Sequence, residues 1–165
     1  MIRYVMTVLV AWTMAASASA SAQEIRGFAL GGITRNVNAE TFPTVGGGAT
    51  VDVGVPWLAA GAQGETFFSW PYFAGRGAVF GQARVPSNGP VRALALAGAG
   101  FGEDAGPLFG GGVEFRPSGQ RLGVRITLED YLTTITPVAC PASAGCAIGP
   151  ERRAHQIAVR AGIVF

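Results

Sequence analysis

The final eleven residues, His155-Gln-Ile-Ala-Val-Arg-Ala-Gly-Ile-Val-Phe165, decide the fold. Successive side chains of a strand point to opposite faces, so the odd-numbered positions share one face and the even-numbered positions share the other. The odd face is apolar from Ile157 to Phe165, whereas the even face carries small or polar side chains such as Gln156 and Arg160. This alternation predicts a strand with one face in an apolar environment and the other in a polar one.

Two classes of barrel satisfy this pattern. In an outer-membrane barrel the apolar face meets lipid and the polar face lines the lumen. In a soluble periplasmic barrel of the lipocalin type, which binds an apolar ligand, the apolar face points inward and the polar face meets water. The terminal aromatic residue, Phe165, favours the membrane barrel, because a soluble barrel has no reason to keep it. The soluble barrel remains the alternative.

The first residues predict export. One positive charge lies within residues 1–4, residues 5–16 are mostly apolar, and Ala18-Ser-Ala20 or Ala20-Ser-Ala22 offers the small-x-small pattern of a cleavage site. The apolar run of about a dozen residues is shorter than the roughly twenty that a membrane-spanning helix needs. The chain is therefore predicted to have a cleaved signal peptide over residues 1–22 and a single domain over residues 23–165.

The composition argues against several functions. The chain is 49% hydrophobic and 13% charged, its basic residues are all arginine, and its net charge of +2 is too small to indicate a nucleic-acid surface. His155 is the only histidine, which excludes metal sites built from several imidazoles. A Ser-His-acid triad would have to use His155 with Asp130 or Glu129, yet no serine lies within two positions of it. We predict no enzymatic activity, no cofactor and no metal.

Eight segments alternate with the period of a strand and are bounded by turn residues. They cover residues 24–35, 44–54, 56–66, 74–85, 91–102, 108–117, 121–132 and 154–165. Tight connections rich in proline and glycine, at 54–56, 86–90 and 117–120, alternate with longer ones, of which 133–153 is the longest. This arrangement predicts an all-β fold, an eight-stranded antiparallel up-and-down transmembrane β-barrel with the tight turns on the periplasmic side.

Eight charged residues are predicted to face the lumen: Asp52, Arg76, Arg84, Glu114, Arg116, Arg125, Glu129 and Arg160. The first, third and fifth segments are rich in alanine and glycine, and their facing is left unassigned. The lumen of an eight-stranded barrel is only wide enough to be filled by side chains. Three carboxylates among five guanidiniums therefore imply a hydrogen-bonded plug with bound water or counter-ions, since an unpaired buried ion is costly. A narrow ion or proton pathway is the alternative role.

Aromatic residues and cysteines add two expectations. Aromatic side chains are predicted to form two interfacial girdles, with Phe67, Phe68, Trp70, Tyr72, Phe73, Phe109 and Tyr131 at the outer rim and Trp57, Phe115 and Phe165 at the inner rim. Cys140 and Cys146 are the only cysteines and lie in the longest loop. In an exported chain they are predicted to form a disulfide.

The signal, the strand count, the alternating connections and the segments Gly110-Gly-Gly-Val-Glu-Phe-Arg116 and Leu122-Gly-Val-Arg-Ile-Thr-Leu-Glu-Asp-Tyr131 resemble those of eight-stranded outer-membrane barrels of Gram-negative bacteria, grouped as OmpA-like transmembrane domains, OmpX-type proteins and small porin-family proteins. The last strand resembles their C-terminal recognition strand through four residues: Val159, Ala161, Ile163 and Phe165. Unlike full-length OmpA proteins, the chain is expected to lack a peptidoglycan-binding domain.

This resemblance implies a location in the outer membrane. It also implies insertion by the barrel-assembly machinery through the last strand, and contact with outer-membrane lipid and lipopolysaccharide. The function that it implies is non-enzymatic: envelope integrity, adhesion through the surface loops, or slight permeability. It supplies no catalytic motif and no ligand for the loops.

Overall fold

The computed structural model describes residues 24–35, 40–55, 57–69, 72–85, 89–102, 105–135, 138–139 and 147–165. The predicted signal peptide, Cys140 and Cys146 lie outside these residues. The long strands are β1 (Ile25–Arg35), β2 (Thr41–Asp52), β3 (Leu58–Ser69), β4 (Tyr72–Arg84), β5 (Val91–Gly102), β6 (Gly106–Phe115), β7 (Gly123–Ile135) and β10 (Arg152–Val164). No helix within the described ranges is long and apolar enough to cross a membrane.

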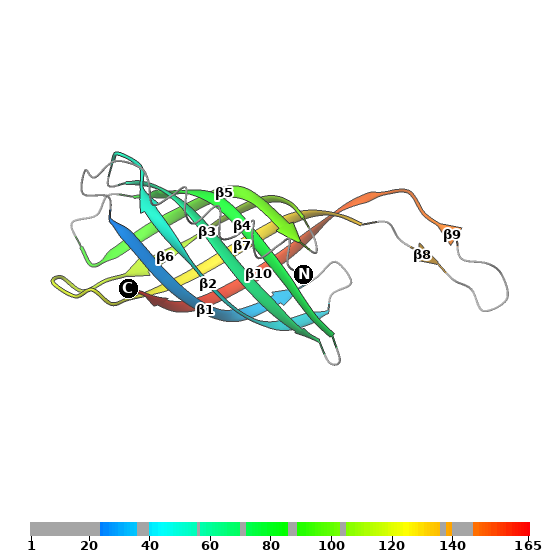
Figure 1. Ribbon diagram of the computed structural model, residues 1–165, viewed down its shortest axis with the longest axis horizontal. Coiled ribbons are helices and arrows are strands. Elements are labelled where there is room, and N and C mark those ends of the chain that lie inside the picture. Colours follow the sequence, from blue (N-terminus) through cyan, green and yellow to red (C-terminus); the bar gives the residue numbers. More distant parts are fainter. Residues whose placement is uncertain are drawn as a thin grey trace, which may run out of the picture.

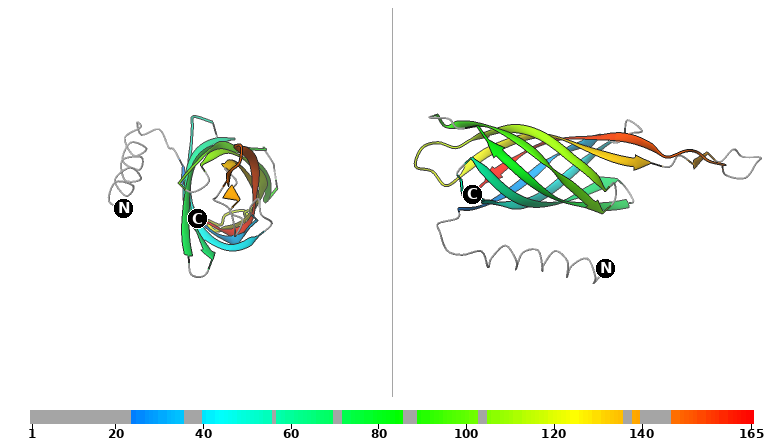
Figure 2. Two further views of the ribbon diagram at one scale, coloured as in Figure 1. Left: turned by 90° about the vertical axis from the view of Figure 1, so that its right-hand side faces the viewer. Right: turned by 90° about the horizontal axis from the view of Figure 1, so that it is seen from above.

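The long strands form one closed antiparallel barrel. Each pairs with its neighbour in sequence, and β10 pairs with both β7 and β1, so the order around the barrel is β1-β10-β7-β6-β5-β4-β3-β2. Figure 1 shows the strands tilted about the barrel axis, and the end-on view in Figure 2 shows the closed ring. Closure leaves the barrel without an edge strand. The predicted eight-stranded antiparallel all-β fold is confirmed.

The tight turns follow from their sequence. Gly54 and Gly119 both adopt φ of +77°, a left-handed conformation that glycine accepts at little cost. In the turn before β7, the N–H of Gln120 donates to the carbonyl of Pro117 at 3.1 Å, with the glycine at the third position as a type II turn requires. These turns lie at the barrel end where β1 begins and β10 ends.

The alternation in β10 separates an apolar exterior from a polar interior. Ile157, Val159 and Ile163 are 45%, 45% and 54% exposed on the outside, whereas Ala158 and Arg160 are buried inside at 0% and 3%. The other strands follow the same parity: Arg26 and Phe28 of β1, Glu65 of β3 and Leu94 of β5 all point inward, as their burial shows. The interior therefore receives most of the charged side chains of the strands.

The longest connection differs from its prediction. β7 continues to Ile135 and β10 begins at Arg152, and the two-residue strands β8 (Val138–Ala139) and β9 (Ala147–Ile148) pair within the segment expected to be a loop. The residues that prolong β7, from Thr133 to Ile135, are all β-branched, and such side chains favour an extended backbone. Figure 1 shows this hairpin extending well beyond the rim of the barrel.

The last residue of the chain closes the seam between β1 and β10. Phe165 and Gly27 exchange two backbone hydrogen bonds, each with an N–O distance of 2.9 Å. The Phe165 ring lies over Gly27, where an added Cβ would approach a ring atom to 2.5 Å. Glycine at position 27 therefore leaves room for the aromatic ring on the outer face of β1. Such a pairing of an aromatic ring with a glycine on the neighbouring strand helps to fix strand register.

We expect Gly27→Val to weaken this seam, because the new side chain displaces the Phe165 ring. The predicted loss in the free energy of unfolding is about 1–3 kcal/mol, the usual cost of overpacking, measured by urea unfolding of the refolded barrel in detergent. Gly64→Val is the matched control, since no atom lies within 4 Å of a Cβ added at this outward-facing glycine. Equal losses in the free energy of unfolding for the two variants would contradict a stabilising role of the contact between Gly27 and Phe165.

Candidate functional site: the ionic interior of the barrel

Among the described residues, the interior of the barrel holds two groups of ion pairs, with six guanidiniums and five carboxylates in total. The terminal cluster lies at the end of the barrel that holds Glu24 and Phe165, and it consists of Glu24, Arg26, Asp52, Arg84, Glu114, Arg116 and Arg125. The central cluster lies about midway along the strands and consists of Glu65, Arg76, Glu129 and Arg160. In both clusters, positive and negative side chains alternate.

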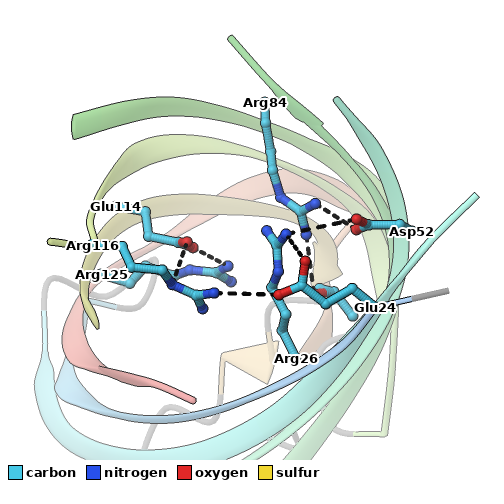
Figure 3. Close-up of polar contacts among 8 residues, drawn as sticks. Glu24, Arg26, Asp52, Arg84, Glu114, Arg116 and Arg125 are labelled. Atoms are coloured by element: carbon cyan, nitrogen blue, oxygen red, sulfur yellow. Dashed lines mark hydrogen bonds and ion pairs between the residues drawn. The ribbon is translucent and has the colours of Figure 1, made fainter. Parts of the chain in front are cut away.

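One half of the terminal cluster joins β6 and β7 to the segment before β1. Arg125 Nη2 donates to Glu114 Oε2 at 2.7 Å, and Arg116 Nε lies 3.9 Å from Glu114 Oε1. Arg116 Nη1 then donates to Glu24 Oε1 at 3.4 Å. Glu114 and Arg125 are buried, whereas the Glu24 side chain is about half exposed at the barrel mouth. Figure 3 shows these side chains converging inside the ring of strands.

The other half continues from Glu24 to β1, β2 and β4. Arg26 Nη2 donates to Glu24 Oε2 at 2.5 Å and lies 3.7 Å from Asp52 Oδ2, and Arg84 Nη1 donates to Asp52 Oδ1 at 2.5 Å. The hydrogen bond from Arg26 holds the pKa of the Glu24 carboxyl below its ordinary value of 4.5. Glu24 therefore carries its negative charge at neutral pH. The terminal cluster is thus one continuous chain of charges that begins and ends with an arginine (Figure 3).

The central cluster joins four strands across the lumen. Arg76 Nε donates to Glu65 Oε1 at 2.6 Å, Arg160 Nη2 lies 2.5 Å from Glu65 Oε2, and Arg160 Nη1 also donates to Glu129. Gln63 Nε2 donates to Glu129 Oε2 at 2.7 Å. Two guanidiniums and two carboxylates therefore balance each other. Removing one partner of such a buried pair leaves an uncompensated charge in the interior.

Aromatic rings cover the central cluster and correct part of the predicted girdle. The guanidinium carbon of Arg76 lies 3.3 Å from the centroid of the Tyr131 ring and 4.8 Å from that of Phe67. Both rings are buried inside the barrel, so their predicted place at the outer membrane interface is wrong. Each residue has the inward parity of its strand, and stacking on a cation stabilises an aromatic ring in this ionic interior.

Apolar side chains lie between the two clusters. Phe80 is placed on β4 between Arg84 of the terminal cluster and Arg76 of the central cluster, and its ring centroid is 6.5 Å from that of Phe28. Arg125 reaches over Phe28 at 5.0 Å. Leu96 and Val164 belong to the same buried group. The interior is thus layered along the barrel axis as charged, apolar and charged again.

The structure places all eight charges of the predicted lumen set in the interior or at its mouth. The terminal cluster contains Asp52, Arg84, Glu114, Arg116 and Arg125, and the central cluster contains Arg76, Glu129 and Arg160. The predicted set lacks five polar partners: Glu24, Arg26, Gln63, Glu65 and Gln156. Sequence reasoning missed Glu65 because β3 alternates poorly. Counting outward from the turn between β3 and β4 pairs Glu65 with Arg76 and would have found it.

The only histidine lies outside the interior. His155 Nδ1 is 2.7 Å from Asp130 Oδ2, and both side chains are on the outer face of the barrel. Of the two acids considered for orienting His155, Asp130 makes the contact, whereas Glu129 points into the lumen. No group of three or more His, Cys, Asp or Glu residues in the described part of the chain is arranged to hold a metal ion.

We expect Glu65→Leu to lower the free energy of unfolding by about 3–5 kcal/mol, because it leaves Arg76 and Arg160 with one carboxylate between them. The double variant Glu65→Leu/Arg76→Leu is expected to recover more than half of this loss, since no charge is then left uncompensated. Urea unfolding of the refolded barrel measures both. A double variant that lost the sum of the two single losses would show that Glu65 and Arg76 act independently.

No protein-family model and no curated protein sequence matches this chain. Among solved structures, the chain is similar to the crystal structure of Neisserial surface protein A (NspA), with a TM-score of 0.57 and 8% sequence identity. The similarity covers 89% of this chain and 98% of the Neisserial chain. At this identity the likeness transfers no residue roles, and it shows that the two chains share a β-barrel fold.

Proposed function

We propose that this chain is a non-enzymatic integral β-barrel protein of the outer membrane of a Gram-negative bacterium, exported by a signal peptide over residues 1–22. The observation that carries the proposal is the inverted distribution of polarity, with an apolar exterior and an ionic interior. Large apolar side chains are exposed on all eight long strands: Ile33, Val45, Phe68, Val79, Val91, Val113, Val124, Ile126, Leu128, Ile157, Val159 and Ile163. A soluble monomer rarely exposes so continuous an apolar surface, because it would associate in water.

The height of the apolar surface fits a bilayer. On β10 the outward positions are apolar from Ile157 to Phe165, which is 165 − 157 = 8 residue steps. At about 3.3 Å per residue, along a strand tilted by about 40°, these steps rise by about 20 Å. The apolar band of outer-membrane barrels is about 25 Å tall.

Exposed aromatic rings lie near both ends of this band. Phe68 and Phe73 stack edge to face at 5.7 Å beside the turn between β3 and β4. Trp57, Phe115 and Phe165 are exposed at the end where β1 begins and β10 ends. Aromatic side chains favour the interface between lipid and water, so this placement supports membrane insertion.

The facing of the strands opposes the soluble alternative. A lipocalin-like barrel needs an apolar cavity for its ligand, whereas here Glu65, Glu129 and Arg160 occupy the middle of the lumen. It also needs a polar outer surface, whereas Ile126 and Leu128 are outward. The apolar face of each strand therefore points outward here, whereas in a lipocalin-like barrel it would point inward.

A lumen filled by ion pairs and apolar side chains favours a role that does not depend on a wide pore. We place this role at the surface loops and in the membrane itself, as envelope integrity, adhesion or slight permeability, in contact with outer-membrane lipid and lipopolysaccharide. The name of NspA describes a surface protein. Assembly would use the C-terminal strand through Val159, Ala161, Ile163 and Phe165. Phe165 also seals the seam, so one residue would serve recognition and closure.

Fractionation of an expressing Gram-negative host tests the location. We expect the protein in the outer-membrane fraction, with a band on a denaturing gel that changes mobility on boiling, because a hydrogen-bonded closed barrel resists detergent until heated. A soluble periplasmic protein without such a shift would overturn the proposal.

Arginine substitution on the outer face tests lipid contact directly. Leu128 lies on β7 within the apolar band, and Leu122 lies just before this strand at the end of the band. In lipid vesicles, Leu128→Arg is expected to reduce the free energy of unfolding by about 2–4 kcal/mol and Leu122→Arg by about 0–1 kcal/mol. In a soluble barrel both exposed leucines would tolerate arginine, so equally small effects would contradict insertion.

A further inference from the structure

The two ionic clusters differ in their charge balance. The central cluster pairs two arginines with two glutamates, but the terminal cluster pairs four arginines with three carboxylates. Arg92 adds to this excess: it is half-buried, has the inward parity of β5, and is opposite Glu114 in register. Among the described side chains, the end of the lumen near Glu24 therefore has more arginines than acidic side chains.

The same cluster contains buried donors without hydrogen-bond acceptors. Arg26 Nε and Nη1, Arg116 Nε and Nη2, and Arg125 Nε have no hydrogen-bond partner within the described residues. The side chains of Arg26 and Arg125 are only 7% and 2% exposed. A buried donor without a partner costs free energy, and for a charged group this cost is larger. A bound ligand that accepts these hydrogen bonds would remove this free-energy cost.

The shape of the unused donors indicates the class of occupant. Nε and Nη2 of Arg116 form one edge of the guanidinium group, and such an edge binds two oxygens of an oxyanion side by side. Glu114 Oε1 is 3.9 Å from Arg116 Nε, which is too far for a hydrogen bond. Water would accept these hydrogen bonds but would leave the positive charge unbalanced, whereas a small anion supplies both acceptors and charge.

We propose that the terminal cluster binds a small oxyanion of the inorganic phosphate class between Arg26, Arg116 and Arg125. The anion enters from the mouth at the terminal end, where the Glu24 side chain is 53% exposed and the Arg116 side chain is 16% exposed. Figure 3 shows the guanidinium groups of these three arginines gathered in the interior on either side of Glu24. The site depends on the closed barrel and does not depend on membrane location.

The test is a titration of the purified, folded barrel in a non-ionic detergent with inorganic phosphate at constant ionic strength. Line broadening of the phosphorus resonance reports binding, and gel mobility without boiling verifies that each variant is folded. We expect saturable broadening with the wild-type protein. Arg116→Gln is expected to weaken binding about tenfold, the loss of one charge-assisted contact.

Arg121→Gln is the matched control, because Arg121 is exposed in the turn at the same end and belongs to neither cluster. It removes the same charge and is expected to leave phosphate affinity unchanged. Asp52→Asn is expected to strengthen binding several-fold, since it increases the excess positive charge of the terminal cluster. If Arg116→Gln does not fold, Arg116→Lys takes its place: it keeps the charge, loses the two-donor edge, and is expected to bind more weakly than the wild type.

Three results would overturn the site: no saturable broadening with the wild-type barrel, equal weakening by Arg121→Gln and Arg116→Gln, or unchanged affinity in the Arg116 variant that folds. The titration uses purified protein. Failure of this proposal is therefore distinguishable from failure of the proposed outer-membrane location, which fractionation decides.

Discussion

Charge pairing across a closed lumen is the constraint on which this structure depends. With apolar side chains on the outside, most charged side chains of the eight strands face the lumen, where they pair with one another. Arg160 shows the result, because it bridges Glu65 of β3 and Glu129 of β7 from a third strand. Such bridges satisfy groups that would otherwise be buried without partners. They also require every strand to keep its register, because a slip of one residue would turn the charges outward.

How far the sequence predicts this arrangement depends on the contrast between alternate positions. β7 and β10 alternate large apolar residues with charged or small ones, so their facing is readable, and the charges on them are placed correctly. β3 has alanine and glycine on both faces, so its facing is not predictable from the sequence. The inward position of Glu65, which bridges two arginines, was therefore not predicted. Tyr131 is misassigned for a different reason. Its position near the strand end suggests a membrane interface, whereas stacking on Arg76 draws it into the lumen.

Small residues have a further role in the interior. Inward glycines of β2 and β6 lie against neighbouring backbone: a Cβ at Gly48 or Gly112 would approach a carbonyl oxygen to 2.1 Å. Their absence of side chains also leaves the lumen free for the long arginines that form the clusters. The abundance of glycine is thus explained in part by strand packing around a charged interior.

The pairing of Gly27 with Phe165 also has a consequence for the order of folding. β1 is the first long strand in the sequence and β10, which pairs with it, is the last, so the contacts that close the barrel join distant parts of the chain. An unpaired edge is a template for association with other chains, and contacts between distant parts of a sequence form slowly. Until β1 and β10 pair, the sheet is open and has two edges that other chains could extend. The pairing of β1 with β10 removes both edges together.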